Sequence, residues 1–186
     1  MSTEKNTKLL VISGSSGVGK GTVIKSLLEK CPFLDLSISC TTRGMRPGEV
    51  HGVNYFFISR EEFQLGVQND EFLEWAEFSG NFYGTKKSYV EECLVNNKNI
   101  LLEIETQGAL QIKQKMPEAV LIFIAPPSFE ELEARLRGRH TETEEAIQKR
   151  LEFVKLELEN SKQYDYVVVN DKVENAVERI IEIIGV

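Results

Sequence analysis

The feature that most constrains the fold of this chain is a glycine-rich loop between an apolar run and a helical pattern. Leu9 to Ser13 is a short apolar run that predicts a strand, and Lys20 to Lys30 places Val23, Leu27 and Leu28 on one side of a helix. The residues between them fit the pattern GxxxxGK, whose backbone N–H groups surround a phosphate: Gly14-Ser15-Ser16-Gly17-Val18-Gly19-Lys20. The sequence therefore predicts a strand, a phosphate-binding loop and a helix in that order.

The chemistry of this loop follows from its glycines and from the helix behind it. Glycines let the backbone fold tightly enough for successive N–H groups to point at one anion, and the helix N-terminus adds a partial positive charge. Lys20 is expected to reach the β- and γ-phosphates of a nucleoside triphosphate. Gly21 stands where Ser or Thr is usual, so Thr22 or water is the expected route to Mg²⁺. The alternative, a flexible Gly/Ser loop without a ligand, fits the flanking strand and helix less well.

Strands and helices alternate at both ends of the chain, which predicts an α/β fold with a parallel sheet. Apolar runs predict further strands at Ile100 to Glu105, Val120 to Ala125 and Tyr166 to Val169, and shorter ones through Leu36, Ile38 and Cys40 and at Tyr55 to Ile58. Helical spacing predicts helices at Arg60 to Asn69, Lys86 to Lys98 and Thr143 to Ser161, one capped by Ser128 with Glu131, and a last one ending near Ile184.

The chain of 186 residues, 41% of them hydrophobic, is long enough for one compact domain with a core. Residues 37–89 break the alternation of strands and helices, so we expect them to form a substrate-binding lobe inserted between core segments 8–36 and 90–186. A polar stretch at residues 138–143, between two predicted helices, is expected to be a mobile lid.

Charge and composition exclude several classes of partner. A net charge of -7 argues against a sequence-independent nucleic-acid binder, which needs a broad basic face. The longest apolar run, Ala119 to Ala125, is too short to cross a bilayer, and the N-terminus carries no apolar signal segment. Cys31, Cys40 and Cys93 have no CxxC spacing and read as reduced thiols, so we expect a cytoplasmic protein.

A second anion site is predicted where two arginines lie three residues apart, at Arg43 and Arg46, beside several hydroxyl side chains. Guanidinium groups match phosphate oxygens bidentately, and Tyr55 and Tyr83 add phenolic donors downstream. Taken alone, two loop arginines are usually solvated; the tyrosines favour the anion site.

Over essentially its whole length the chain resembles the guanylate kinases. The stretches that carry this resemblance are Gly14 to Thr22, Ser39 to Glu49 with Tyr55, Glu71 to Trp75, Gly80 to Thr85, Leu102 to Gly108, Ala125 to Ser128, Gly138 to Arg150 and Val169 to Asp171. The resemblance implies a three-layer P-loop fold with a central parallel sheet, an inserted GMP-binding lobe and a mobile lid.

The resemblance also implies roles for individual residues. Arg43, Arg46, Tyr55 and Tyr83 would grip the GMP phosphate, while Glu74, Ser39 and Thr85 would read the guanine edge. The chemistry agrees, because guanine offers N1–H and 2-NH₂ as a donor pair that one carboxylate accepts and that adenine lacks.

Two acids follow at alternating positions of one predicted strand. The resemblance assigns Glu105 to GMP, although the family commonly has Asp there, and Glu103 is a candidate near the metal; a solvated strand end is the alternative for both.

Arginines near the expected lid are the candidates for stabilising the transferred phosphoryl group. By the resemblance Arg135, Arg139 and Arg150 surround the ATP phosphates and Arg137 stays solvated, while Asn170 faces the adenine. Phosphoryl transfer needs charge stabilisation more than covalent chemistry, which suits arginines delivered by a lid. The alternative is that these arginines have no catalytic role and lie on a solvated helix face, paired with nearby glutamates.

The expected reaction is ATP + GMP giving ADP + GDP, with dGMP as a further acceptor, in purine nucleotide metabolism. Mg²⁺ is the expected cofactor, ATP and GMP are the expected partners, and no nucleic acid, membrane or obligate protein partner is expected. One rival is a guanylate-kinase-like interaction module without catalysis, against which Lys20 and the arginine set argue. The other is a kinase for a different monophosphate on the same fold.

Overall fold

The computed structural model describes residues 8–138 and 143–185. The chain divides into two compact units that interleave along the sequence. The first unit contains the chain up to Val11 together with Phe33–Val120, and the second contains Ile12–Pro32 together with the chain from Leu121 onward.

The first unit holds one part of a parallel sheet. The strands β2 (Leu34–Leu36), β7 (Asn99–Glu103) and the start of β1 (Leu9–Gly14) follow one another in that order, and β2 is parallel to β7 with Leu34 opposite Asn99. Ile100, Leu101 and Leu102 are fully buried. Two helices flank β7 in the chain, α3 (Lys87–Val95) before it and α4 (Thr106–Lys115) after it.

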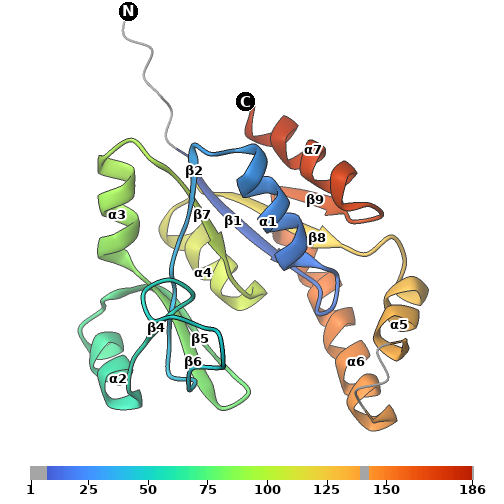
Figure 1. The fold of residues 1–186 in the computed structure, drawn as a ribbon, viewed down its shortest axis with the longest axis horizontal. Helices are drawn as coiled ribbons and strands as arrows, with labels where there is room; N and C mark the ends of the chain where they lie inside the picture. The colour runs from blue at the N-terminus through green and yellow to red at the C-terminus, as the bar shows by residue number, and fades with distance from the viewer. Residues whose placement is uncertain (1–7, 139–142, 186) are drawn as a thin grey trace, which may run out of the picture. The chain divides into compact units, whose positions relative to one another are not determined.

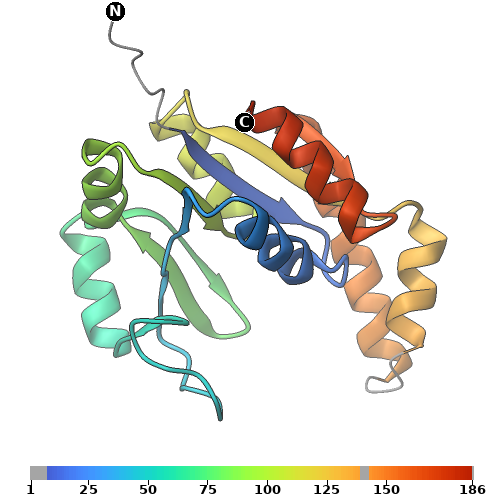
Figure 2. The same ribbon diagram turned by 45° about the horizontal axis from the view of Figure 1, so that its top comes forward.

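A second sheet of the first unit carries strands in the order β4 (Phe56–Phe57), β3 (Cys40–Thr41), β6 (Asn81–Lys86) and β5 (Phe72–Phe78). The long antiparallel hairpin of β5 and β6 is visible in both ribbon views (Figures 1 and 2). Its turn needs two residues with positive φ, which Ser79 at 50° and Gly80 at 74° supply.

A small aromatic core holds the helix α2 (Arg60–Gln68) against this second sheet. Phe63 stacks on Phe72 and Phe82, with ring centroids 4.3 and 5.3 Å apart. Phe63 and Phe72 are both buried, so the hairpin and α2 form one packed layer rather than a loose insertion.

The second unit holds the end of β1, then β8 (Val120–Ala125) and β9 (Tyr166–Val169), in the order β1-β8-β9. Strands β8 and β9 are parallel, with Ile122 opposite Tyr166. The helices α1 (Lys20–Lys30) and α7 (Val173–Ile184) lie side by side (Figures 1 and 2). Leu132 and Leu136 of α5 (Phe129–Arg137) pack against Ile147, Leu151 and Val154 of α6 (Glu144–Asn160).

The predicted α/β fold with a parallel sheet is confirmed, and most predicted helices and strands agree within a few residues. Two strand predictions need correction. The alternation through Leu36, Ile38 and Cys40 is not one strand, because β2 ends at Leu36 in one sheet and β3 begins at Cys40 in another. The strand predicted to reach Glu105 ends at Glu103, because Glu105 already occupies the N-cap position of α4, without a capping hydrogen bond from its side chain.

The helices built by the described residues include none that is both long and apolar enough to cross a membrane. The expected lid at 138–143 falls mostly on residues 139–142, outside the described residues.

Candidate functional site

The glycine-rich loop is held at both ends by backbone geometry that only glycine accommodates easily. A Cβ on Gly14 would lie 2.7 Å from the carbonyl oxygen of Ile124, so β1 and β8 approach more closely here than a side chain allows. Gly19 precedes α1 with φ of 91° and accepts hydrogen bonds from the N–H groups of Thr22 and Val23. The loop therefore delivers Lys20 as the first residue of α1.

Two charged side chains of α6 contact one residue of this loop. The backbone N–H of Ser16 donates to Glu157 Oε2 at 3.0 Å, and Arg150 donates to Ser16 Oγ through Nε and Nη2, both at 3.2 Å. Arg150, predicted to bind phosphates, is thus beside the loop. Glu157 was missed, although a signal existed: it follows Val154 by three residues and so falls on the buried stripe of α6, where only 3% of it is exposed.

Asn170 is fixed against the same loop. Its Nδ2 donates to the carbonyl of Val18 at 2.8 Å and its backbone N–H donates to Ala125 at 2.8 Å, with only 5% of the residue exposed. A cavity of about 580 Å³, called here the loop pocket, opens beside it. The residues lining the loop pocket are Gly17, Val18, Gly19, Thr22, Gly138, Asn170, Asp171 and Val173.

The remaining lid arginines differ in what the structure describes. Arg135 is described only by its place in α5, and Arg139 lies outside the described residues. Arg137, predicted to stay solvated, has 38% of its side chain exposed and bonds to Glu133 in its own helix and to Glu144 at the start of α6. The hydrogen bond from Arg137 is the main reason that the pKa of Glu144 falls to about 2.

The first unit contains a separate cavity of about 210 Å³, called here the base pocket. Five of the residues predicted to bind GMP line it: Ser39, Tyr55, Glu74, Tyr83 and Glu105. Glu103 lines it as well, and both Glu103 and Glu105 are exposed. Thr85, Arg43 and Arg46 are not part of the lining.

Glu74 is the most deeply buried acid of the base pocket, with 3% exposed. Its Oε1 accepts a hydrogen bond of 2.7 Å from Thr85 Oγ1, and β5 and β6 place the two residues directly opposite each other. Burial raises the pKa of Glu74 to about 7, against the opposing effects of the Thr85 hydrogen bonds and of Lys115.

Gly108, in the first turn of α4, makes room for this carboxylate. A Cβ on Gly108 would lie 2.4 Å from Glu74 Oε2 and 3.1 Å from Glu74 Cδ. Sequence reasoning placed Gly108 inside a family stretch without a role, because nothing in the local pattern indicates which side chain it faces.

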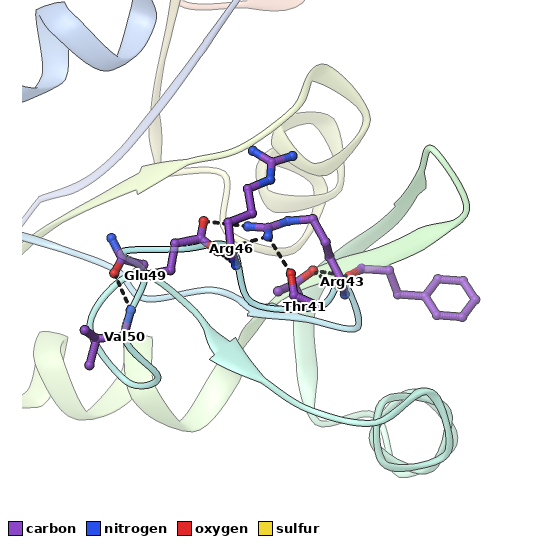
Figure 3. A network of polar contacts seen from close by, with 8 residues as sticks. Thr41, Arg43, Arg46, Glu49 and Val50 are labelled. Atoms are coloured by element: carbon purple, nitrogen blue, oxygen red, sulfur yellow. Dashed lines mark hydrogen bonds and ion pairs between the residues drawn. The ribbon is translucent and has the colours of Figure 1, made fainter.

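Three aromatic residues beside the base pocket, Tyr55, Phe57 and Tyr83, are called here the aromatic wall, and Arg43 lies against it. Its guanidinium carbon is 5.5 Å from the ring centre of Tyr55 and 5.7 Å from that of Phe57, and Tyr55 in turn packs edge-on against Tyr83. Arg43 also forms an ion pair with Glu49, and their hydrogen bond is the main reason that the pKa of Glu49 falls to about 2. The exposed Arg46 side chain extends away from this pair (Figure 3).

For a metal, the loop pocket offers the hydroxyl of Thr22, while Gly21 has no side chain to offer, and a Cβ at Gly21 would meet no atom within 4 Å. Among residues 8–138 and 143–185, no group of three His, Cys, Asp or Glu side chains is arranged to hold a metal ion.

Comparison with known proteins connects both pockets to one family. The family model for guanylate kinase matches residues 6–185, a range that includes every residue lining the loop pocket and the base pocket. The chain belongs to the guanylate kinase family.

Individual relatives support this membership of the guanylate kinase family. A guanylate kinase of Halalkalibacterium halodurans is 54% identical over 92% of this chain and 84% of the relative. A guanylate kinase of Synechocystis is 50% identical over 98% of this chain and 96% of the relative. A crystal structure of guanylate kinase from Anaplasma phagocytophilum superimposes with a TM-score of 0.78 at 36% identity, covering 96% of this chain and 84% of that chain.

Proposed function

We propose that the protein is an ATP-dependent guanylate kinase, which transfers the γ-phosphoryl group of ATP to GMP and releases ADP and GDP. The observation that carries this proposal is a buried carboxylate, Glu74, held by Thr85 at the wall of the base pocket. dGMP is proposed as a second acceptor.

The base pocket suits guanine because a buried carboxylate needs hydrogen-bond donors in place of water. Thr85 supplies one donor to Oε1 of Glu74, and guanine N1–H and 2-NH₂ supply two more to the same carboxylate. Adenine presents no such pair, so AMP would leave the carboxylate poorly satisfied. Ser39 and Glu105, which also line the pocket, are the proposed further contacts to the base.

The acceptor phosphate is proposed to bind at the aromatic wall, through Arg43, Arg46, Tyr55 and Tyr83. Arg43 is held over the Tyr55 ring, and Tyr83 lines the pocket that takes the base. A phosphate here gains charge-assisted hydrogen bonds from guanidinium groups and a neutral phenol donor.

ATP is proposed to bind at the loop pocket through the backbone of residues 14–22, Lys20 and Asn170. The left-handed turn at Gly19 directs the loop into the N-terminus of α1, whose orphan N–H groups favour phosphate. Arg150, bonded to the loop at Ser16, is proposed to reach the ATP phosphates, and Arg135 and Arg139 are proposed to join it.

Mg²⁺ is proposed to arrive with ATP and to be held mainly by phosphate oxygens and water. Thr22 is proposed to contact the metal either directly or through a water molecule. This assignment fits the residues present, because Mg²⁺ in nucleotide kinases needs only one or two protein oxygens and keeps several waters. When bound, the metal neutralises part of the phosphate charge.

The chain's own contribution to the reaction is proposed to be orientation and charge stabilisation. Lys20, Arg43, Arg135, Arg139 and Arg150 supply cationic groups for the negative oxygens of the transferred phosphoryl group, and no covalent intermediate on the protein is needed. Residues 37–89 are proposed as the GMP-binding lobe and 138–143 as a lid that excludes water. A cytoplasmic location is proposed from the three cysteines, which are buried and not disulfide-bonded.

A panel of acceptors tests this proposal directly. With ATP and Mg²⁺, GMP and dGMP should be phosphorylated, and AMP, UMP and CMP should be converted at least about a hundredfold less efficiently. Lys20→Ala serves as the inactive control. No GMP-dependent ADP release from the intact chain would overturn the kinase proposal and favour the interaction module, while equal use of the acceptors would favour a different monophosphate kinase.

Glu74→Gln tests the assignment of the base-reading residue, since its amide group can no longer accept two donors at once. The preference for GMP over AMP should fall by about two orders of magnitude. Glu77→Gln, an exposed acid on the same strand, is the matched control and should keep the preference. Unchanged selectivity in the Glu74 variant would remove Glu74 from its proposed role.

A further inference from the structure

Glu49 belongs to a tight turn that brings its side chain back onto the arginine loop. The sequence Arg46-Pro47-Gly48-Glu49 has proline second and a glycine with φ of 86° third, the pattern of a type II turn. The turn is closed by the Glu49 N–H, which donates to the Arg46 carbonyl at 3.1 Å. In the opposite direction, the Arg46 N–H donates to Glu49 Oε2 at 2.7 Å.

The Glu49 carboxylate also forms a bidentate ion pair with Arg43 (Figure 3). Arg43 Nη1 donates to Oε2 at 2.9 Å and Nη2 donates to Oε1 at 2.7 Å, while Nη1 also donates to the Gly44 carbonyl at 2.7 Å. Only 14% of the Arg43 side chain and 18% of the Glu49 side chain is exposed. This pair is therefore better shielded from water than an ordinary surface ion pair.

These contacts divide the guanidinium into two edges. Glu49 occupies the end edge, formed by Nη1 and Nη2, and Gly44 takes the other hydrogen of Nη1. The side edge, formed by Nε–H and the second hydrogen of Nη2, is engaged by neither of them. A guanidinium can bind a second oxyanion bidentately through this edge.

The aromatic rings limit the remaining freedom of Arg43. Tyr55 and Phe57 both lie within 6 Å of the guanidinium carbon, at 5.5 and 5.7 Å, so they restrict rotation of its plane. The Tyr83 hydroxyl also interacts with the Arg43 guanidinium. With its end edge paired with Glu49 and its plane held near the Tyr55 and Phe57 rings, Arg43 presents its side edge to a ligand that Tyr83 would share.

We propose that Glu49 is a positioning residue for the acceptor phosphate: it holds Arg43 so that the side edge of the guanidinium meets the phosphate of the nucleoside monophosphate. This inference rests on the proposed function. Glu49 acts through Arg43 and does not touch the substrate.

A competing role is that Glu49 occupies the phosphate site in the empty protein and leaves when substrate binds. The turn argues against displacement, because the carboxylate would give up the Arg46 N–H as well as both bonds to Arg43. The two roles predict opposite effects. Removing a positioning group weakens substrate binding by raising the ordering cost of Arg43, whereas removing a competitor strengthens it.

The test compares GMP with guanosine, which has the base but not the phosphate. In Glu49→Gln, the KM for GMP should rise about tenfold or more, while kcat changes by less than about threefold. The inhibition constant of guanosine and the KM for ATP should stay within about twofold of the unchanged protein. Glu61→Gln, an exposed acid of α2 in the same unit, is the matched control and should change none of these values.

Each other outcome counts against the proposal. An unchanged KM for GMP shows that Glu49 does not position Arg43, and a lowered one shows that it competes with the phosphate. Equal losses for GMP and guanosine show a general structural role. If the unchanged protein does not phosphorylate GMP at all, the proposed function fails first, and calorimetric binding of GMP to the same variants still tests the positioning role.

Discussion

At the scale of single residues, the base pocket depends on a carboxylate that burial makes hard to ionise. The ordinary pKa of 4.5 rises to about 7 for Glu74, because desolvation outweighs the hydrogen bonds from Thr85. A raised pKa in the folded state means that folding favours the protonated acid. The contribution of Glu74 to the unfolding free energy is therefore complete below pH 4.5, where the acid is protonated in both states, and is lost as the pH rises through about 7.

This titration gives a pH-dependence of stability in the absence of ligands. Between pH 4.5 and about 7, the unfolding free energy of the unchanged protein should fall relative to that of Glu74→Gln by on the order of 3 kcal/mol. Urea denaturation of both proteins across this range measures the difference. Glu77→Gln, whose acid is exposed, should follow the unchanged protein, and parallel curves for the Glu74 variant would show that its pKa is not raised.

The glycine beside this carboxylate makes a second prediction at the same scale. In Gly108→Ala the new Cβ would collide with Glu74 Oε2, whose partner oxygen is held by Thr85, so the carboxylate has to move. A displacement of this size should raise the KM for GMP by up to about a hundredfold and leave the KM for ATP unchanged. Gln107→Ala, at an exposed position in the same helix, is the control and should change neither KM. An unchanged KM for GMP in the Gly108 variant would show that the Glu74 carboxylate can avoid the new methyl group and still bind the base.

At the scale of elements, sequence patterns predicted the regular ends of the chain better than its middle. The strand, loop and helix around residues 9–30 and the strand β9 were correct because apolar runs and glycines report them directly. The hairpin β5–β6 was missed, because a register shift between Phe72 and Glu74 breaks the alternation expected of a strand. The helix α4 was missed as well.

The candidate site shows the same division. Residues expected to touch a ligand, such as Glu74 and Asn170, were predicted because the family resemblance points to them. Residues that only touch those groups were not, and Glu49, Gly108 and Glu157 are the clearest cases. The roles of Gly108 and Glu157 depend on contacts between segments that are distant in the sequence, and the role of Glu49 depends on a turn, which composition and spacing do not reveal.

One element also offers a test of a local rule. The helix α2 begins with a full capping box, in which Ser59 Oγ accepts from the Glu62 N–H at 3.1 Å and Glu62 Oε2 accepts from the Ser59 N–H at 2.8 Å. Ser59→Ala should lower the unfolding free energy by about 1 kcal/mol, measured by urea denaturation. Ser88→Ala, an exposed position inside α3, should cause no loss, and equal effects would remove the cap as the cause.

At the scale of the whole molecule, the two pockets belong to different compact units. All residues lining the base pocket lie in Phe33–Val120, and all residues lining the loop pocket lie in the other unit. A ligand at a hundred times its dissociation constant stabilises the state that binds it by about 2.7 kcal/mol. If the units open separately, each ligand should first suppress the openings of its own unit.

Amide hydrogen exchange can therefore assign each nucleotide to its pocket. GMP alone should slow exchange in β5, β6 and α4, whose residues surround Glu74, while ATP alone should slow exchange in the loop before α1 and around Asn170. Glu74→Gln should weaken only the GMP effect and Lys20→Ala only the ATP effect, so each variant is the control for the other. GMP that slowed exchange around Asn170 and left β5 and β6 unaffected would place the acceptor in the loop pocket and reverse the assignment, because protection arises where binding energy is gained.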